Sequence, residues 1–405
     1  MPLLKDDASP YAWARLAVSL TLMTISGCSM YAVVVVLPAV QAEFGVARAD
    51  ASLPYSLTMI GFGVGGLFMG RLADRFGVMV PLLIGALSLG LGFAAAGMAG
   101  NIWTFSLAHG VLIGVFGSSA MFAPLIADTS LWFTRRRGIA VAICASGNYL
   151  AGAVWPPVVH HFVAIYGWRS TYEGIGLFCV ITLSVLALFL RRRPSVVATD
   201  AALSVAAASS RPFGLPPAAA QSLLCVAGLA CCVAMSMPQV HIVAYCGDLG
   251  YGVARGAEML SLMMGFGIIS RIGSGYLADK IGGIRTLLIG SMAQGFALLF
   301  YLFFDSLTSL YIISAMFGLF QGGIVPSYAI IVRETMPASE AATRVGIVIF
   351  ASVFGMSFGG WISGVIFDAT GSYAAAFANG LAWNALNITI MLSLLIRARQ
   401  RLAMA

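Results

Sequence analysis

The sequence predicts an all-α polytopic membrane protein with twelve transmembrane helices in two six-helix halves. Hydrophobic residues make up 60% of its 405 residues, only 9% are charged, and twelve apolar stretches are long enough to cross a bilayer. Soluble proteins carry roughly 25% charged residues. This composition therefore excludes a soluble enzyme, a disordered protein and, despite a net charge of +7, a nucleic-acid partner. A mean hydropathy of +0.95 is too high for the alternating strands of a membrane β-barrel.

The predicted spans follow from the roughly 20 helical residues that one crossing of a 30 Å hydrocarbon core requires. In the first half they are 16–40, 53–70, 78–99, 103–127, 138–163 and 171–190, and in the second 218–246, 257–277, 285–304, 308–331, 345–367 and 374–396. Residues 191–217 are rich in Arg, Ala, Ser and Pro, which favours a cytoplasmic linker over a span. The expected organisation is a half at 1–190, a linker at 191–217 and a half at 218–405.

Basic residues predict the orientation of these spans. With both termini cytoplasmic, 18 of the 22 Lys and Arg residues lie on the inner side. Arg48, Arg169 and Arg255 fall outside, and Arg271 lies within a span. Cytoplasmic loops carry the excess of Lys and Arg, so we expect both termini inside.

The two halves resemble each other in sequence. The segment from Gly70 to Gly77, GRLADRFG, recurs 205 residues later from Gly275 to Gly282 as GYLADKIG. Two halves with the same topology form a parallel repeat, whose axis runs along the membrane normal. Substrate sites in such transporters lie near the midplane, between the halves.

The repeated GxLADxxG loop resembles the signature of the major facilitator superfamily, in the correct place in both halves. The resemblance implies the major facilitator fold, with Asp74 at the cytoplasmic N-terminus of helix 11 and Asp279 at that of helix 5. Helix N-termini favour carboxylates. These aspartates, with the basic neighbours of the motif, are then candidate gating residues: Asp74, Arg71, Arg75, Asp279 and Lys280. A tight turn with topology-setting charges is the alternative, although it does not explain the paired aspartates.

A narrower resemblance appears at the fifth helix. The stretch from Leu131 to Ala140, LWFTRRRGIA, and the stretch from Asp368 to Phe377, DATGSYAAAF, are similar to motifs of the monocarboxylate transporter family. The acidic-Gly-aromatic motif that precedes helix 1 in that family is absent. This departure points to a prokaryotic member, related to the oxalate–formate antiporters, in the bacterial inner membrane.

Arg271 is the one charged residue deep inside a predicted span. An arginine at mid-bilayer costs about 2.5–3.5 kcal/mol even on the insertion scale, and its equivalent in the first half is Gly66. A guanidinium binds a carboxylate through two parallel hydrogen bonds. Resemblance agrees, because Arg271 falls on the family's helix-8 substrate arginine. The alternative is an arginine that bonds backbone carbonyls or snorkels along its helix.

Polar and aromatic residues in the cavity-lining helices are further candidates for substrate binding. They are Tyr31, Ser118, Ser119, Asn148 and Tyr149 in the first half, and His241, Tyr245, Tyr328 and Ser357 in the second. Tyr328 resembles a helix-10 tyrosine of the oxalate–formate group. His241 titrates near neutrality and could relay a proton, or it could pack as a hydrogen-bonded histidine. The two serines could equally be small residues for close packing.

One cation favours one carboxylate, so the expected function is a secondary transporter of a lactate- or pyruvate-like monocarboxylate by alternating access. Proton-coupled symport is expected, and a monomer is expected as the functional unit. The open alternatives are an organic-anion exchanger of the oxalate–formate type and a drug or metabolite exporter. An intramembrane enzyme would need a His/Asp/Glu cluster in the spans. No such cluster, metal site or cofactor is expected.

Overall fold

The computed structural model describes residues 10–133, 137–192, 212–336 and 340–404. Within these ranges the chain is helical and contains no strand. Contacts along the chain divide it into two compact units, residues 1–46 with 50–198 and residues 47–49 with 199–405. Most of the expected linker, 193–211, lies outside the described residues.

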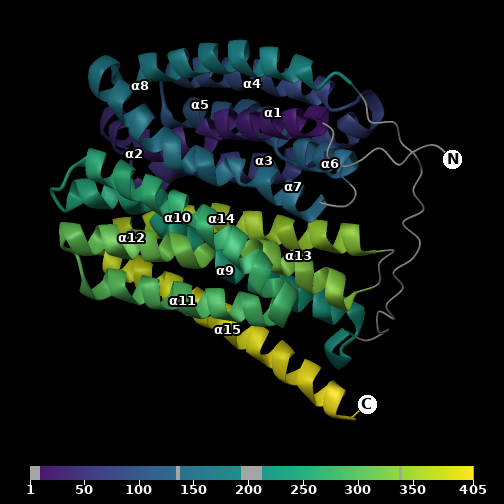
Figure 1. Ribbon diagram of the computed structural model, residues 1–405. Coiled ribbons are helices and arrows are strands. Elements are labelled where there is room, and N and C mark those ends of the chain that lie inside the picture. Colours follow the sequence, from purple (N-terminus) through teal and green to yellow (C-terminus); the bar gives the residue numbers. More distant parts are fainter. Residues whose placement is uncertain (1–9, 134–136, 193–211, 337–339, 405) are drawn as a thin grey trace. The chain divides into compact units, whose positions relative to one another are not determined.

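The first unit consists of helices that pack mainly on the long helix α8. Its elements are α1 (Pro10–Ser26), α2 (Cys28–Phe44), α3 (Arg48–Phe76), α4 (Met79–Gly97), α5 (Ile102–Leu107), η1 (Ala108–Gly117), η2 (Ser118–Met121), α6 (Ala123–Trp132), α7 (Arg137–Ala145) and α8 (Gly147–Phe189). Helices α1, α2 and α4 all contact α8, and Figure 1 shows α4 and α8 side by side.

The second unit is built around α9. Its elements are η3 (Pro212–Gly214), α9 (Pro217–Asp248), α10 (Val253–Ile281), α11 (Gly283–Phe303), α12 (Leu307–Gln321), α13 (Ile324–Thr335), α14 (Ala341–Thr370) and α15 (Tyr373–Met404). Helix α9 packs against α10, α14 and α15. In Figure 1 these elements run from green to yellow.

Eleven stretches of the described chain are long and apolar enough to cross a membrane. One of them, Ile139–Phe189, has 51 residues. At 1.5 Å per residue a straight helix of this length would measure about 76 Å, more than twice the hydrocarbon core. It turns at Gly167, whose φ of 78° is outside the helical region. This stretch therefore supplies both the fifth and the sixth predicted crossing, and the predicted all-α polytopic fold is confirmed.

The internal repeat extends to backbone conformation. Gly77 has φ 84° and Gly282, 205 residues later, has φ 83°. Gly45 and Gly250 form a second pair at the same offset, with φ 61° and 82°. Residues with a Cβ rarely adopt these positive φ values. The same turns thus recur at matching places in the two units.

Candidate functional site

Arg271 lies in α10, eight residues before Asp279, and its side chain is only partly exposed. Helix α10 packs very closely on the segment where α12 ends and α13 begins. A Cβ added at Gly322 would collide with the carbonyl of Gly267, and one at Gly323 would collide with Ser274. The glycines allow the two backbones to approach, as small residues do between membrane helices. Arg271 is therefore held at the level of this helix break.

Tyr328, the candidate in α13, is fully buried within the second unit. Its hydroxyl donates to Oδ1 of Asn387 at 2.7 Å, and Nδ2 of Asn387 donates to the Ser291 hydroxyl at 2.8 Å. This chain of hydrogen bonds links α13, α15 and α11. The tyrosine is thereby fixed in the bundle, although its oxygen retains a lone pair for a further donor.

His241 and Tyr245 lie on α9, near its outer end in the predicted orientation. His241 is fully buried, and its Nε2 is 2.8 Å from the carbonyl of Gly360 in α14. Because a carbonyl only accepts, Nε2 must carry the proton. Nδ1 has no hydrogen-bond partner among the described residues. The imidazole is thus anchored on one side and has an available lone pair on the other.

A cluster that the sequence analysis missed surrounds Arg48, which belongs to the second unit with residues 47 and 49. Its guanidinium donates to the hydroxyl of Tyr373 at 2.6 Å and pairs with Asp248 at 3.0 Å. Asp368 accepts from the backbone N–H of Arg48 at 2.8 Å. The Tyr373 ring contacts His241, with 5.8 Å between centroids. Arg48 is 6% exposed, so its charge is buried and paired inside the second unit. It is not simply an exposed basic residue of an outer loop.

The remaining second-unit candidate, Ser357, is buried in α14. Tyr245 is half-buried, and its ring packs on Tyr373 and Phe377 with centroids 5.1 and 5.6 Å away. The second unit therefore brings His241 and Tyr245 together through the shared neighbour Tyr373.

In the first unit, Ser118 and Ser119 form part of a 3-10 turn that follows a π-helix. The hydroxyl of Ser118 lies 2.7 Å from that of Ser29 in α2, two residues before Tyr31. Ser119 donates to the carbonyl of Val115. Tyr31 is 8% exposed, whereas Asn148 and Tyr149 are half-buried at the start of α8. The serine contacts agree with close packing and bring η2 against the candidate Tyr31 region.

His109, in the π-helix η1, was also missed by the sequence analysis. It is fully buried, with Nδ1 3.2 Å from the Thr58 hydroxyl and Nε2 3.3 Å from the Tyr172 hydroxyl. Thr58 donates its own proton to the carbonyl of Pro54 at 2.7 Å. Nδ1 must then donate to Thr58, and Nε2 accepts from Tyr172. π-Helices often occur at functional sites. A histidine within a predicted membrane span is the sequence feature that could have pointed to His109.

The candidate gating residues lie at the exposed ends of α3 and α10. Asp74, Arg71 and Arg75 are exposed in α3, as are Asp279 and Lys280 in α10. Lys280 lies over the ring of Tyr276 at 4.4 Å. The contacts expected between these aspartates and the opposite half remain predictions.

An acidic side chain that was not predicted as functional caps a helix in the second unit. Glu334, at the end of α13, accepts from the backbone N–H of Gly283, with oxygens at 3.2 and 3.3 Å. The first unit places a buried pair, Arg15 with Asp128, beside the corresponding loop.

Long apolar helices, a repeated turn motif and a membrane-embedded arginine define a class, the multi-span membrane transporters. Comparison with known proteins identifies the family. The family described as Major Facilitator Superfamily matches residues 20–315 and 275–403. The chain therefore belongs to the major facilitator superfamily and is a transporter, not an enzyme.

Individual relatives are similar at low identity. Monocarboxylate transporter 13 of Bos taurus is 26% identical over 337 residues, which cover 81% of this chain and 75% of the relative. The uncharacterized MFS-type transporter YcxA of Bacillus subtilis is 25% identical over 371 residues, 86% of each chain.

Solved structures show the same fold. A mutant of the nucleoside transporter NupG has a TM-score of 0.74 and 12% identity, over 95% of this chain and 99% of that one. A bacterial homologue of the human lysosomal transporter Spinster, inward-facing and unoccupied, has a TM-score of 0.71 and 13% identity, over 97% and 96%.

Proposed function

We propose that this chain carries a small monocarboxylate, such as lactate or pyruvate, across the bacterial plasma membrane by alternating access with proton symport. The observation that supports this most is the position of Arg271 within the membrane-spanning helix α10, ten residues before its end at Ile281. A guanidinium there recognises a carboxylate bidentately. The similarity to a protein named monocarboxylate transporter 13 favours the same substrate class.

The proposed site uses the second unit as a rigid frame. Arg271 binds the carboxylate at the level of the Gly322–Gly323 break, while Tyr328 is oriented by Asn387. The substrate's charge offsets that of the arginine, which lowers the cost of a closed, dry state. Tyr31 and Asn148 of the first unit stay sequence-based candidates for substrate binding.

Uptake of radiolabelled lactate into proteoliposomes tests this proposal. We expect uptake that an inwardly directed proton gradient stimulates. Removing one partner of a buried charge pair costs about 2–5 kcal/mol, so Arg271→Ala should lower uptake at least 30-fold. Arg255 is the matched control, because it lies on the same helix, is exposed and pairs with Glu258 at 3.0 Å. Arg255→Ala should retain uptake within twofold.

Two results would reject the proposal. One is a lack of carboxylate uptake by active protein. The other is full lactate uptake by Arg271→Ala. An exporter of amphipathic drugs, the alternative, would also tolerate Arg271→Ala. Stimulation by preloaded carboxylate but not by the proton gradient would favour the alternative, an anion exchanger of the oxalate–formate type.

A further inference from the structure

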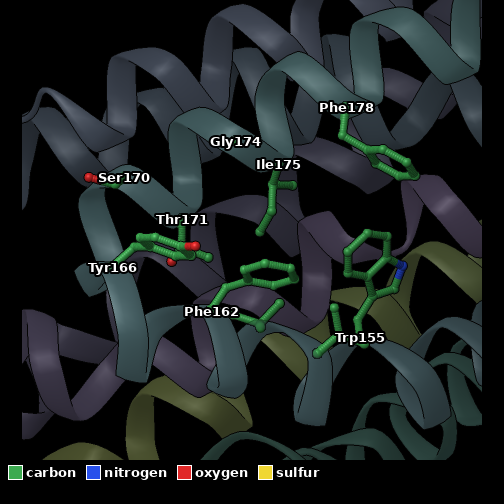
Figure 2. A pocket seen from close by; sticks show the side chains of 10 residues that line it. Trp155, Phe162, Tyr166, Ser170, Thr171, Gly174, Ile175 and Phe178 are labelled. Atoms are coloured by element: carbon green, nitrogen blue, oxygen red, sulfur yellow. The ribbon is translucent and has the colours of Figure 1, made fainter.

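The two arms of α8 line a cavity of about 580 Å³ within the first unit. Residues 147–166 form one arm and 168–189 the other, and Gly167 joins them. Side chains from both arms line the cavity, as Figure 2 shows for Trp155, Phe162, Ile175 and Phe178. None of the lining residues carries a charge. This chemistry excludes the anion proposed for Arg271 as the ligand of this cavity.

The length of the cavity matches one leaflet of a membrane. On the first arm its lining residues extend from Trp155 to Tyr166, and on the second from Ser170 to Phe178. Eleven residues of helix span about 16 Å. Half of the 30 Å hydrocarbon core is about 15 Å. A cavity that begins at the turn between two spans therefore reaches from one membrane surface to about the midplane.

Polarity changes along the cavity in the same direction. Tyr166, Ser170 and Thr171 lie together at the end next to the Gly167 turn, and Trp155 and Phe178 lie at the opposite end in Figure 2. Tyrosine is enriched at membrane interfaces, where its hydroxyl reaches polar groups. Thr171 already donates to the carbonyl of Gly167 at 2.7 Å, so the hydroxyl donors at the surface end are Tyr166 and Ser170. The inner end has an aromatic wall.

The cavity is open to the surroundings along its side. Phe162 is 46% exposed and Phe178 is 43% exposed, although both belong to membrane-spanning helices. The surroundings of such helices are lipid chains. Water is not expected at the inner end of the cavity, because the aromatic and aliphatic side chains there offer it few hydrogen-bond partners.

We propose that this cavity is a binding site for one acyl chain of a membrane glycerophospholipid. The chain lies along Phe162 and Ile175 and ends near Trp155. Ester and phosphate oxygens accept hydrogen bonds from Tyr166 and Ser170 at the surface end. Each CH₂ buried contributes about 0.8 kcal/mol, so a long chain is favoured over a small apolar molecule. The site is separate from Arg271 and does not depend on the proposed substrate.

Gly174 provides the means to test this site. It lines the cavity, and a Cβ at this position would meet no atom within 4 Å. Gly174→Phe therefore fills the cavity without a clash in the bundle. Ile181→Phe is the matched control, because Ile181 lies on the same arm, is 56% exposed and does not line the cavity.

The experiment uses the full chain in proteoliposomes that contain phosphatidylcholine with a photoreactive diazirine on its acyl chain. We expect crosslinks to map to residues 155–178, to fall at least fivefold in Gly174→Phe, and to stay within twofold in Ile181→Phe. Tyr166→Phe, which leaves the cavity open, should lower labelling about two- to threefold.

Equal labelling in wild type and Gly174→Phe would overturn the proposal. So would crosslinking between two copies through this cavity, or full displacement of the lipid by an amphipathic drug. If Gly174→Phe fails to fold, Gly174→Leu replaces it with the same expectation.

Discussion

At the scale of single residues, Arg15 and Asp128 form an ion pair in which both side chains are buried. Their side chains are only 3% and 7% exposed, with Nη2–Oδ1 at 2.8 Å and Nε–Oδ2 at 2.9 Å. Trp132 covers the guanidinium, whose centre lies 4.7 Å from the ring centroid. Both charges are thus removed from solvent and neutralised bidentately.

Removing one charge of this pair should lower the free energy of unfolding far more than replacing both residues by apolar ones. Asp128→Asn leaves a buried guanidinium without its counterion, a loss of about 3–5 kcal/mol. The double variant Arg15→Met with Asp128→Leu should recover most of the thermal stability, because neither charge remains. Arg255→Gln, which breaks an exposed pair, should change stability by about 0–1 kcal/mol. Thermal unfolding of the purified protein in detergent measures all three. A double variant as unstable as Asp128→Asn would contradict the argument.

His241 is the residue to test for proton coupling. The groups around it are the ring of Tyr373, the carbonyl of Gly360 and the charges of Arg48 and Asp368. In His241→Gln the amide can still donate to Gly360 but cannot take up a proton. We expect stimulation of lactate uptake by a proton gradient to fall at least fivefold, with lactate exchange within twofold of wild type. His160→Gln is the control. Undiminished stimulation in His241→Gln would place the coupling elsewhere.

Gln294 is a buried polar residue whose partners are absent from the described chain. The side chain is fully buried, and neither of its amide atoms has a hydrogen-bond partner there. An unsatisfied buried group costs about 1–3 kcal/mol. Gln294→Met should therefore raise the thermal midpoint. Gln239→Met should lower it, because Gln239 donates to Gln321 at 2.8 Å. A lower midpoint for Gln294→Met would show that a bound water completes the amide's hydrogen bonds.

At the scale of elements, the close contact between α10 and the α12–α13 break determines where Arg271 lies. Gly322→Ala would place a methyl group against the carbonyl of Gly267. Overpacking of this kind costs about 1–3 kcal/mol. We expect a lower thermal midpoint and lower lactate uptake, since α10 must move. Gly273→Ala, with no neighbour within 4 Å, should retain both or gain stability. Equal effects of the two variants would contradict a packing role.

The elements also show what sequence reasoning can and cannot predict. The spans and the repeated turns follow from local patterns, since hydropathy sets helix length and Gly77 and Gly282 share a motif. The need for a glycine at position 27 does not follow locally, because the atom that a Cβ there would meet belongs to Ala151, 124 residues away. Arg48 illustrates the same limit within the site. Its partners Asp248 and Tyr373 lie 200 and 325 residues further along the chain, and local spacing does not encode such pairs.

At the scale of the whole molecule, the duplicated units stabilise an acidic side chain beside the same loop in two different ways. Each has a GxLADxxG loop whose last glycine has a positive φ. Beside this loop the first unit buries Asp128 against Arg15, whereas the second aims Glu334 at the N-terminus of α11. A basic side chain and a helix N-terminus both stabilise a carboxylate. The duplication therefore preserved the turn and the acidic group but not the partner of the acidic group.

The distribution of basic residues predicts how the whole molecule lies in the membrane, and helix α11 allows a direct test. Arg285 near the start of α11 and Asp305, two residues beyond its end at Phe303, are both exposed. The 21 residues of α11 span about 30 Å. With both termini inside, Arg285 is cytoplasmic and Asp305 external.

The native cysteines give little background, because six are buried and only Cys225 is partly exposed. In a Cys225→Ser background, a membrane-impermeant maleimide added to intact cells should label Asp305→Cys at least tenfold more than Arg285→Cys. Permeabilisation should equalise the two. The reverse labelling pattern would show that both termini are external, and the lipid cavity of α8 would then open at the cytoplasmic leaflet.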